Sequence, residues 1–218
     1  ATLIRQLYSE TKLTLEQGGE ALNRENRMAE AKKILREKLS GWDPKDIKLE
    51  TGRHYPPYWQ GFQIGAQFAF AKLLKSLGAD EIKIDLTPDT DRDATRICFA
   101  LSDHPGIFSR LSGALALVGA NVVDARSYTS KDGFATAAFW VQDADGAPYD
   151  ESRFSRLRAM IEKILSGEII TRDAIKERDK FKKRERAFKV PTSITFNNEG
   201  SEIYTIIEVD TRDRPGLL

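Results

Sequence analysis

An internal repeat constrains the fold of this chain more than any other feature of its sequence. When the sequence is aligned with itself at an offset of 110 residues, alternating apolar residues and a turn match without a gap. The turn is Asp103-His104-Pro105-Gly106 in the first copy and Asp213-Arg214-Pro215-Gly216 in the second. Self-similarity at a fixed offset indicates a duplicated structural unit. We therefore expect two copies of one strand-rich unit.

The first copy, residues 80–166, predicts strands and helices in the order strand, strand, helix, strand, strand, helix. Alternation of apolar and polar residues predicts a strand, whereas apolar residues three or four positions apart predict an amphipathic helix. The strands are expected at 82–86, 95–101, 121–130 and 134–142, and the helices at 107–118 and 150–166. This order predicts an α+β fold.

The second copy covers residues 191–218 and begins with a predicted strand at 192–196. It lacks the helix, the hairpin and the last helix of the first copy, so its strand pair would leave an apolar face open to water. We expect a truncated unit whose parent protein continues beyond Leu218. The segment 167–190 is rich in both basic and acidic residues, which favours a solvated helical linker over a patch for nucleic acid or another anionic partner.

Residues 1–79 have helical periodicity. A stripe of apolar residues predicts a helix from Arg24 to Leu39, ended by Ser40-Gly41. A second helix, apolar on nearly all sides, is expected from Gln60 to Leu77. Pro56 and Pro57 argue against a helix through residues 54–59.

Composition narrows the class of protein. The 34 lysines and arginines nearly balance the 33 aspartates and glutamates, which gives no reason to expect nucleic acid or an anionic membrane as the main partner. The single cysteine, Cys98, cannot form an internal disulfide. The longest apolar stretch, 107–118, is too short and too interrupted to span a bilayer. We expect a cytoplasmic protein without a membrane or nucleic-acid partner.

No catalytic or metal site can be assembled from the sequence. His54 and His104 are its only histidines, and they form no recognisable set with serine, cysteine or aspartate. We expect this chain to carry no catalytic residue, metal or cofactor.

The Asp-x-Pro-Gly turn is the predicted ligand site. Asp103 can cap the following helix, Pro105 suits its first turn, and Gly106 lets a ligand approach the backbone. The N–H groups of Ile107 and Phe108 would then face outward, and a helix N-terminus suits the carboxylate of a small amino acid. The alternative is that the turn only starts a helix, but its repetition favours ligand binding.

Asn121, which precedes the next strand, offers a polar side chain for the ligand's amino group or side chain. The complete predicted ligand-binding set is Asp103, His104, Pro105, Gly106, Ile107, Phe108, Asn121, Val122, Asp213, Pro215, Gly216 and Leu217. A valine at position 106 is expected to abolish binding with little effect on folding.

The stretch Asp103–Leu111, followed by Gly119–Arg126, resembles an ACT domain. Together with residues 139–143, 204–209 and 213–218, it resembles the tandem ACT domains of the bifunctional uridylyltransferase/uridylyl-removing enzyme family. The helical lead-in, around residues 3–8 and Tyr58-Trp59, is similar to the segment that follows the hydrolytic domain in that family. The resemblance implies a ferredoxin-like fold, usually βαββαβ, in which strand 82–86 here takes the place of the usual fourth strand.

The same resemblance implies a function. In that family the full protein transfers uridylyl groups from UTP to the PII nitrogen-signalling protein with a divalent metal such as Mg²⁺, and removes them hydrolytically. Paired ACT units, within one chain or between chains, sense glutamine. The catalytic parts and their metal would then lie N-terminal of Ala1. Two alternatives remain: a docking module that holds PII, and the regulatory tail of another amino-acid-responsive enzyme.

Overall fold

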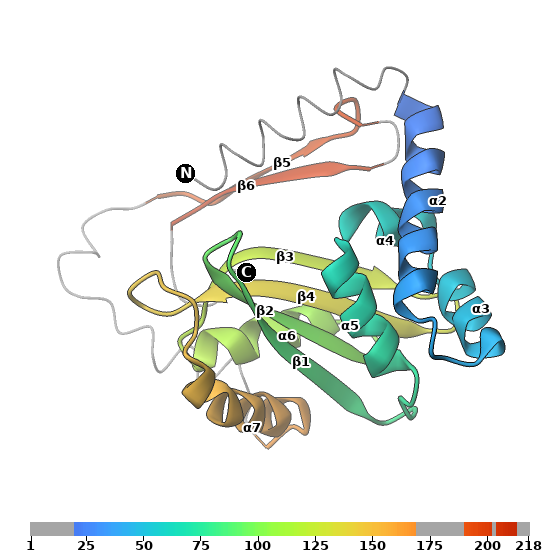
Figure 1. Ribbon diagram of the computed structural model, residues 1–218. Helices are drawn as coiled ribbons and strands as arrows, with labels where there is room; N and C mark the ends of the chain where they lie inside the picture. Colours follow the sequence, from blue (N-terminus) through green and yellow to red (C-terminus); the bar gives the residue numbers. More distant parts are fainter. Residues whose placement is uncertain (1–19, 169–189, 202–203, 213–218) are drawn as a thin grey trace.

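The computed structural model describes residues 20–168, 190–201 and 204–212 (Figure 1). The helices in these residues are α2 (Glu20–Lys38), α3 (Pro44–Arg53), α4 (Pro56–Gly61), α5 (Ile64–Leu74), α6 (Ile107–Leu117), α7 (Phe154–Leu165) and the 3₁₀ turn η1 (Glu151–Arg153). The strands are β1 (Ile82–Asp89), β2 (Ala94–Ser102), β3 (Asn121–Thr129), β4 (Phe134–Gln142), β5 (Ser193–Asn197) and β6 (Ile206–Asp210). The strands and helices predicted for the first copy are therefore confirmed, with ends shifted by a few residues.

The first four strands form one antiparallel sheet in the order β1-β2-β4-β3. Ile84 of β1 lies opposite Phe99 of β2, and Ile97 of β2 lies opposite Phe139 of β4. β1 is therefore an edge strand beside β2. This confirms that the early strand takes the place of the fourth strand of a ferredoxin-like fold.

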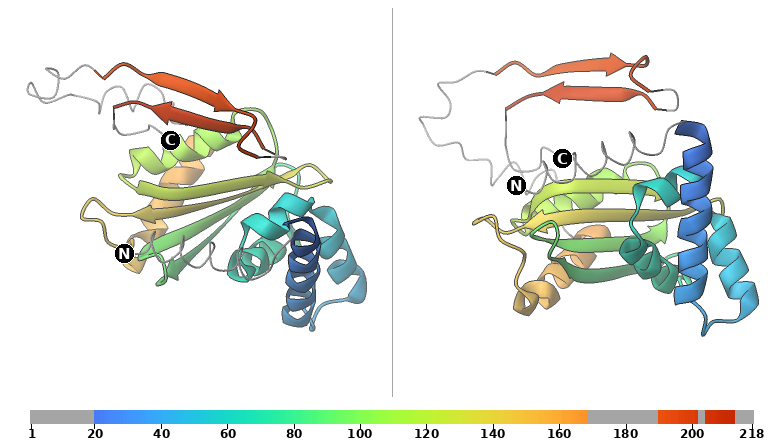
Figure 2. Two further views of the ribbon diagram at one scale, coloured as in Figure 1. Left: turned by 90° about the horizontal axis from the view of Figure 1, so that it is seen from above. Right: turned by 45° about the horizontal axis from the view of Figure 1, so that its top comes forward.

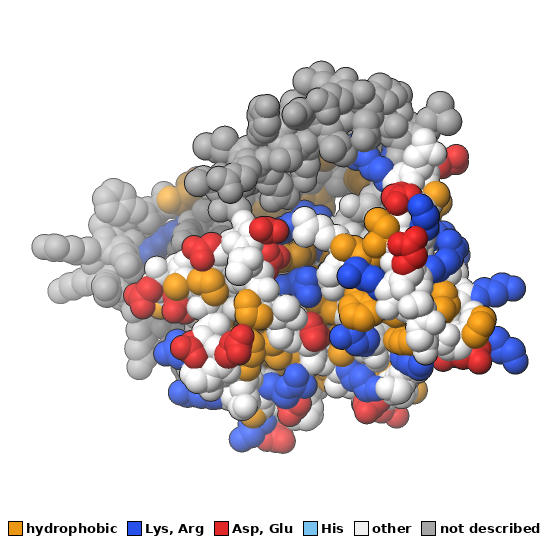
Figure 3. All heavy atoms as spheres, viewed as in Figure 1, with side chains coloured by type: hydrophobic (Ala, Val, Ile, Leu, Met, Phe, Trp, Pro, Cys, Tyr) orange, Lys and Arg blue, Asp and Glu red, His pale blue; other side chains and the backbone are white. Residues whose placement is uncertain are grey.

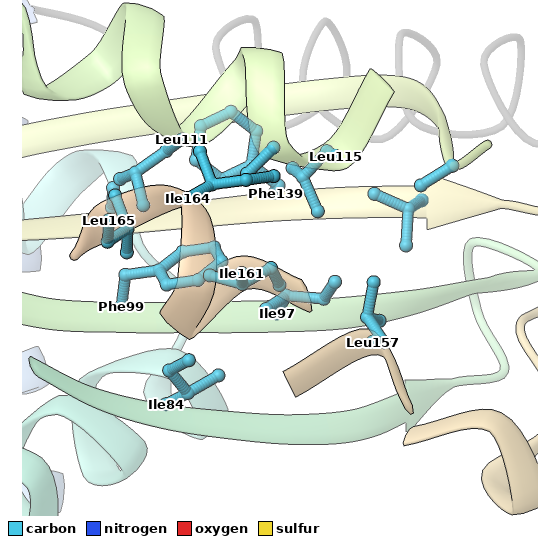
Figure 4. Close-up of a cluster of buried hydrophobic side chains, with 14 of the residues drawn as sticks. Ile84, Ile97, Phe99, Leu111, Leu115, Phe139, Leu157, Ile161, Ile164 and Leu165 are labelled. Atoms are coloured by element: carbon cyan, nitrogen blue, oxygen red, sulfur yellow. The ribbon is translucent and has the colours of Figure 1, made fainter. Parts of the chain in front are cut away.

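One face of the sheet is covered by α6 and α7. Large side chains from both helices and from β1, β2 and β4 interlock there (Figure 4). The best buried members of this cluster are Ile97, Phe99, Leu111, Leu115, Phe139, Leu157 and Ile161. Burial of so many large side chains makes this the main apolar contribution to the stability of the ACT-like unit.

The opposite face of the sheet is covered by α4 and α5, and α2 packs on these two helices, so the strands lie between two layers of helices (Figures 1 and 2). Small side chains on the sheet, including Ala94, Cys98, Ala100 and Ala138, let α5 pack closely against β2. The helical segment and the sheet thus share a core. Burial raises the pKa of the Cys98 thiol to about 12, so this cysteine stays protonated at neutral pH.

The helical lead-in differs from its prediction at the prolines. Pro56 and Pro57 lie at the first positions of α4, where a missing N–H costs nothing, so the expectation that they exclude a helix is wrong. The single helix expected from Gln60 to Leu77 is instead two helices, α4 and α5, separated at Phe62-Gln63. α3, which the periodicity did not predict, begins at Pro44 after the N-cap Asp43.

β5 and β6 form a separate two-stranded sheet that confirms the internal repeat. Ile194 pairs with Val209 and Phe196 with Ile207, at 110 residues from the pairs Ile84–Phe99 and Leu86–Ile97 of the first copy. The register of the two hairpins is therefore identical. The second turn, with Asp213, Pro215, Gly216 and Leu217, and most of the predicted linker lie outside the described residues.

Candidate functional site

The ligand turn (Asp103–Gly106) leads from the end of β2 into α6 and is exposed to solvent. The Asp103 backbone N–H donates to the Gly133 carbonyl at 2.9 Å, and Asp103 Oδ2 accepts from Thr129 Oγ1 at 2.7 Å. Both contacts fasten the turn to the end of the β3–β4 hairpin. The prediction that Asp103 caps α6 is wrong, because its carboxylate is held by Thr129 and the N-cap residue is Gly106. Pro105 likewise precedes the first turn of α6.

Gly106 has a left-handed backbone, with φ of +83°, which glycine adopts at little cost. This conformation turns the chain so that the Ile107 N–H donates to the His104 carbonyl at 3.2 Å. The expectation that the Ile107 N–H is free is therefore wrong. The N–H groups of Phe108 and Ser109 have no hydrogen-bond acceptor among the residues that the structure describes.

Two open donors at the start of an eleven-residue helix suit an anion. Unpaired N–H groups and the positive end of the helix dipole act together at this position. No acidic side chain lies in the first turn of α6 to occupy them. The turn can therefore hold a carboxylate through Phe108 and Ser109, rather than through Ile107 and Phe108.

The side chains around this turn divide into anchors and exposed groups. Ile107 is buried, and the Phe108 ring stacks on Phe139 with ring centres 5.2 Å apart, so both fix the first turn of α6 in the core. His104 is exposed, with Nδ1 3.2 Å from the Pro105 carbonyl oxygen. His104 is thus a solvent-facing side chain beside the start of α6.

Asn121 and Val122 lie at the other end of the sheet. Asn121 begins β3 and pairs with Gln142, whereas the ligand turn is fastened to Thr129 at the last residue of the same strand. Nine strand residues span roughly 27 Å. Within one unit, the two halves of the predicted site cannot contact the same small ligand. A β-bulge between Val122 and Asp124 bends the strand at that end.

The sequence reasoning missed Thr129, Gly133 and Ser109. Pairing of the predicted strands 95–101 and 134–142 would have placed residue 133 beside residue 103, because Ser102 lies opposite Phe134. Ser109 could have been found only by knowing that the His104 carbonyl accepts from the Ile107 N–H, which shifts the open donors by one residue.

Replacing Gly106 by valine should destabilise the fold as well as weaken ligand binding. A Cβ at this position would meet nothing within 4 Å, but a β-branched residue at φ +83° costs at least about 1–2 kcal/mol. Urea unfolding of the variant measures this cost. A loss of stability is thus expected, in place of the unchanged folding expected from the sequence. Gly106→Asn is the matched control, because asparagine tolerates the left-handed region. Equal unfolding midpoints for Gly106→Val and wild type would contradict the structural role of φ.

Other kinds of site were sought in residues 20–168, 190–201 and 204–212. This part of the chain has no group of three or more His, Cys, Asp or Glu side chains arranged to hold a metal ion. Nor does any of its helices combine the length and apolar character needed to cross a membrane.

Comparison with known proteins places the ligand turn in a family. Residues 97–151 match the ACT domain. The whole chain is 64% identical, over 224 residues, to 24% of the bifunctional uridylyltransferase/uridylyl-removing enzyme of Ruegeria pomeroyi. It is 65% identical, over 218 residues, to 23% of the enzyme of the same name from Cereibacter sphaeroides. It is 38% identical, again along its whole length, to that of Azospirillum brasilense.

The chain spans about a quarter of the length of the curated relatives that it matches. The ACT-domain match, the β1-β2-β4-β3 sheet and the full-length identity agree with one another. The chain therefore contains a segment that matches the ACT domain, and it is homologous along its whole length to part of the bifunctional uridylyltransferase/uridylyl-removing enzymes.

Proposed function

We propose that this chain is the amino-acid-sensing region of a larger enzyme, and that the amino acid is glutamine. The observation that carries the proposal is that the N–H groups of Phe108 and Ser109, which follow an Asp-x-Pro-Gly turn, have no acceptor in the part of the chain that the structure describes. The same sequence turn recurs 110 residues later. A duplicated anion-binding turn fits a sensor built from two ACT units.

In this proposal the α-carboxylate of glutamine binds the Phe108 and Ser109 N–H groups, because a helix N-terminus favours an anion. The beginning of β3 from a neighbouring ACT unit completes the site. Its Asn121 and Val122 then contact the amino group or the side chain of the bound glutamine. Pairing of ACT units would thus join two halves of a site that about 27 Å of strand separates within one unit.

The parent protein is proposed to be the enzyme that its relatives' name describes, using UTP to uridylylate the PII protein and removing those groups hydrolytically. Its catalytic residues and its Mg²⁺ would then belong to other parts of that protein, in the cytoplasm. Glutamine must bind one arrangement of the ACT units more tightly than another to change catalysis.

The route from the ligand turn to the helical segment passes through the β3–β4 loop (Ser130–Gly133). Gly133 holds Asp103, and the adjacent Asp132 pairs with Arg53 of α3 at 3.0 Å. The Lys131 N–H also donates to the Arg53 carbonyl at 2.8 Å. A shift of the turn on binding would therefore act on α3 and on the helices packed around it.

Glutaminamide, in which the α-carboxylate of glutamine is an amide and the side chain is unchanged, provides a sharp test of this binding mode. We expect glutamine to raise the thermal unfolding midpoint of the complete protein, and glutaminamide to leave it unchanged. Glutamate and asparagine serve as controls for the side chain. Equal stabilisation by glutaminamide would mean that the helix N-terminus does not hold the carboxylate.

The second candidate is a docking module that holds PII. It predicts that this region binds PII with an affinity that glutamine does not change. A pull-down of PII with and without glutamine separates the two, because a sensor requires the amino acid to alter either binding or turnover.

A further inference from the structure

An open groove with a volume of about 530 Å³ lies between α3 and the β3–β4 loop. From α3 it is lined by Lys45, Lys48, Leu49 and Gly52, which are spaced three or four positions apart and so share one helix face. The other lining residues are Arg53, Lys131 and Asp132. We call this the lysine groove.

The lysine groove carries uncompensated positive charge. Asp132 is neutralised by Arg53, whose Nη2 lies 3.0 Å from the Asp132 carboxylate. Lys45, Lys48 and Lys131, by contrast, have no carboxylate within 4 Å among the described residues. Three exposed cations therefore face the groove without an acidic partner.

More cations lie beside it. Burial, and then the charges of Lys131 and Arg36, lower the pKa of Lys32 on α2. The nearby positive charges thus disfavour the charged form of Lys32, and an anion bound beside Lys131 would reduce that repulsion.

Apolar surface lies among these cations. Leu49 is 56% exposed and Tyr55 is 52% exposed, so apolar surface of both side chains is open to a partner. Lys131 Nζ lies 5.6 Å from the centre of the Tyr55 ring. At Gly52 an added Cβ would meet nothing within 4 Å, so the groove has room for a side chain from a partner. Figure 3 shows Lys and Arg side chains at the edge of the molecule over α2 and α3, with apolar side chains between them.

We propose that the lysine groove binds an acidic protein segment that carries an apolar side chain. Its carboxylates would pair with Lys45, Lys48 and Lys131, and its apolar side chain would lie on Leu49 above Gly52. Charge complementarity of this kind directs a partner to its site and selects against neutral or basic ones. The surface is separate from the proposed glutamine site, which it adjoins through the β3–β4 loop.

A protein segment fits the groove better than a phosphate-bearing partner does. The N-terminus of α3, the natural phosphate site of this region, is closed because Asp43 Oδ1 accepts from the Lys45 N–H at 2.8 Å. The one arginine of the groove, Arg53, is engaged by Glu50 and Asp132. Exposed Leu49 has no hydrogen-bond donor to offer to a phosphate.

The test uses the full 218-residue chain and a fluorescein-labelled peptide of alternating glutamates with a central leucine, followed by fluorescence anisotropy. Lys48→Glu should weaken binding at least about tenfold, because it replaces attraction by repulsion in the groove. The matched control is Lys163→Glu, at an exposed position in the last turn of α7 on the other face of the sheet, which should change the affinity less than about twofold. Gly52→Leu adds a side chain inside the lysine groove and should weaken peptide binding without changing any charge.

Two altered peptides measure separately how much the leucine and the glutamates contribute to the binding affinity. Replacing the central leucine of the peptide by serine should weaken binding, whereas replacing its glutamates by glutamine should abolish it. Urea midpoints of the variants show that the fold is retained. The proposal is overturned if the peptide does not bind the wild-type chain, if Lys48→Glu and Lys163→Glu weaken binding equally, or if the leucine is without effect. It is also overturned if single-stranded DNA or inorganic polyphosphate binds through Lys48 while the peptide does not.

Discussion

Replacing Arg53 by alanine should lower the free energy of unfolding by about 3–5 kcal/mol, the cost of leaving a buried charge without its partner. Arg53 is 8% exposed, and its Nη1 lies 3.3 Å from the carboxylate of Glu50, which is 2% exposed. Its Nη2 pairs with Asp132 of the β3–β4 loop. The variant would keep Glu50 in the interior with only His54 beside it, at 3.1 Å. Urea unfolding followed by circular dichroism measures the loss.

The matched control is Lys33→Ala, which removes a surface ion pair with Glu30 at 4.0 Å. These side chains are more than 60% exposed, so the change should cost less than about 1 kcal/mol. If both variants lost equally little stability, the Arg53 pairs would not hold α3 against the β3–β4 loop, and the proposed route from the ligand turn to the helices would lose its central contact.

Replacing Phe139 by alanine should cost about 3–5 kcal/mol through the cavity that it leaves between the sheet and α6. The ring is fully buried and lies 5.8 Å from the Phe99 ring in an edge-to-face arrangement (Figure 4). It also stacks on the ring of Phe108. Because Phe108 belongs to the first turn of α6, the change should also loosen the open N–H groups and weaken ligand binding.

Phe139→Leu serves as the control, because a change that keeps most of the volume usually costs less than about 1.5 kcal/mol. Differential scanning calorimetry of both variants gives the comparison. A Phe139→Ala variant as stable as Phe139→Leu would show that the core of the ACT domain collapses around the cavity, and that Phe139 does not support the ligand turn.

The strands of the first copy could be predicted because their apolar residues alternate. The position of β1 followed from the internal repeat, since an offset of 110 made the segment around Ile84 part of the unit. The identical register of the two hairpins, Ile84–Phe99 and Ile194–Val209, rests on the same residues that revealed the repeat.

The covering of the second sheet face could not be predicted from periodicity. Cys98, Ala100 and Ala138 are small and apolar. Such residues are compatible both with a solvent-exposed sheet face and with a face covered by a helix such as α5. The local role of Pro56 was also ambiguous, because a proline both ends one helix and suits the first turn of the next.

The candidate site was predicted in part. The turn was recognised from Asp103, Pro105 and Gly106, but which residue caps α6 depends on backbone angles that residue types do not determine. The hydrogen bond from Thr129 to Asp103 joins residues 26 positions apart, and only the hairpin register brings them together.

Calorimetric titration of the complete protein with glutamine tests the central claim most directly, namely that the ligand turn of this ACT domain binds an amino acid. We expect saturable heat with glutamine, weaker heat with glutamate and asparagine, and loss of the glutamine signal in Gly106→Asn. Asparagine tolerates the left-handed backbone, and its side-chain oxygen at the N-cap of α6 can accept from the N–H groups that would hold the ligand. No heat with any of the three amino acids, or an unchanged glutamine affinity in Gly106→Asn, would contradict it.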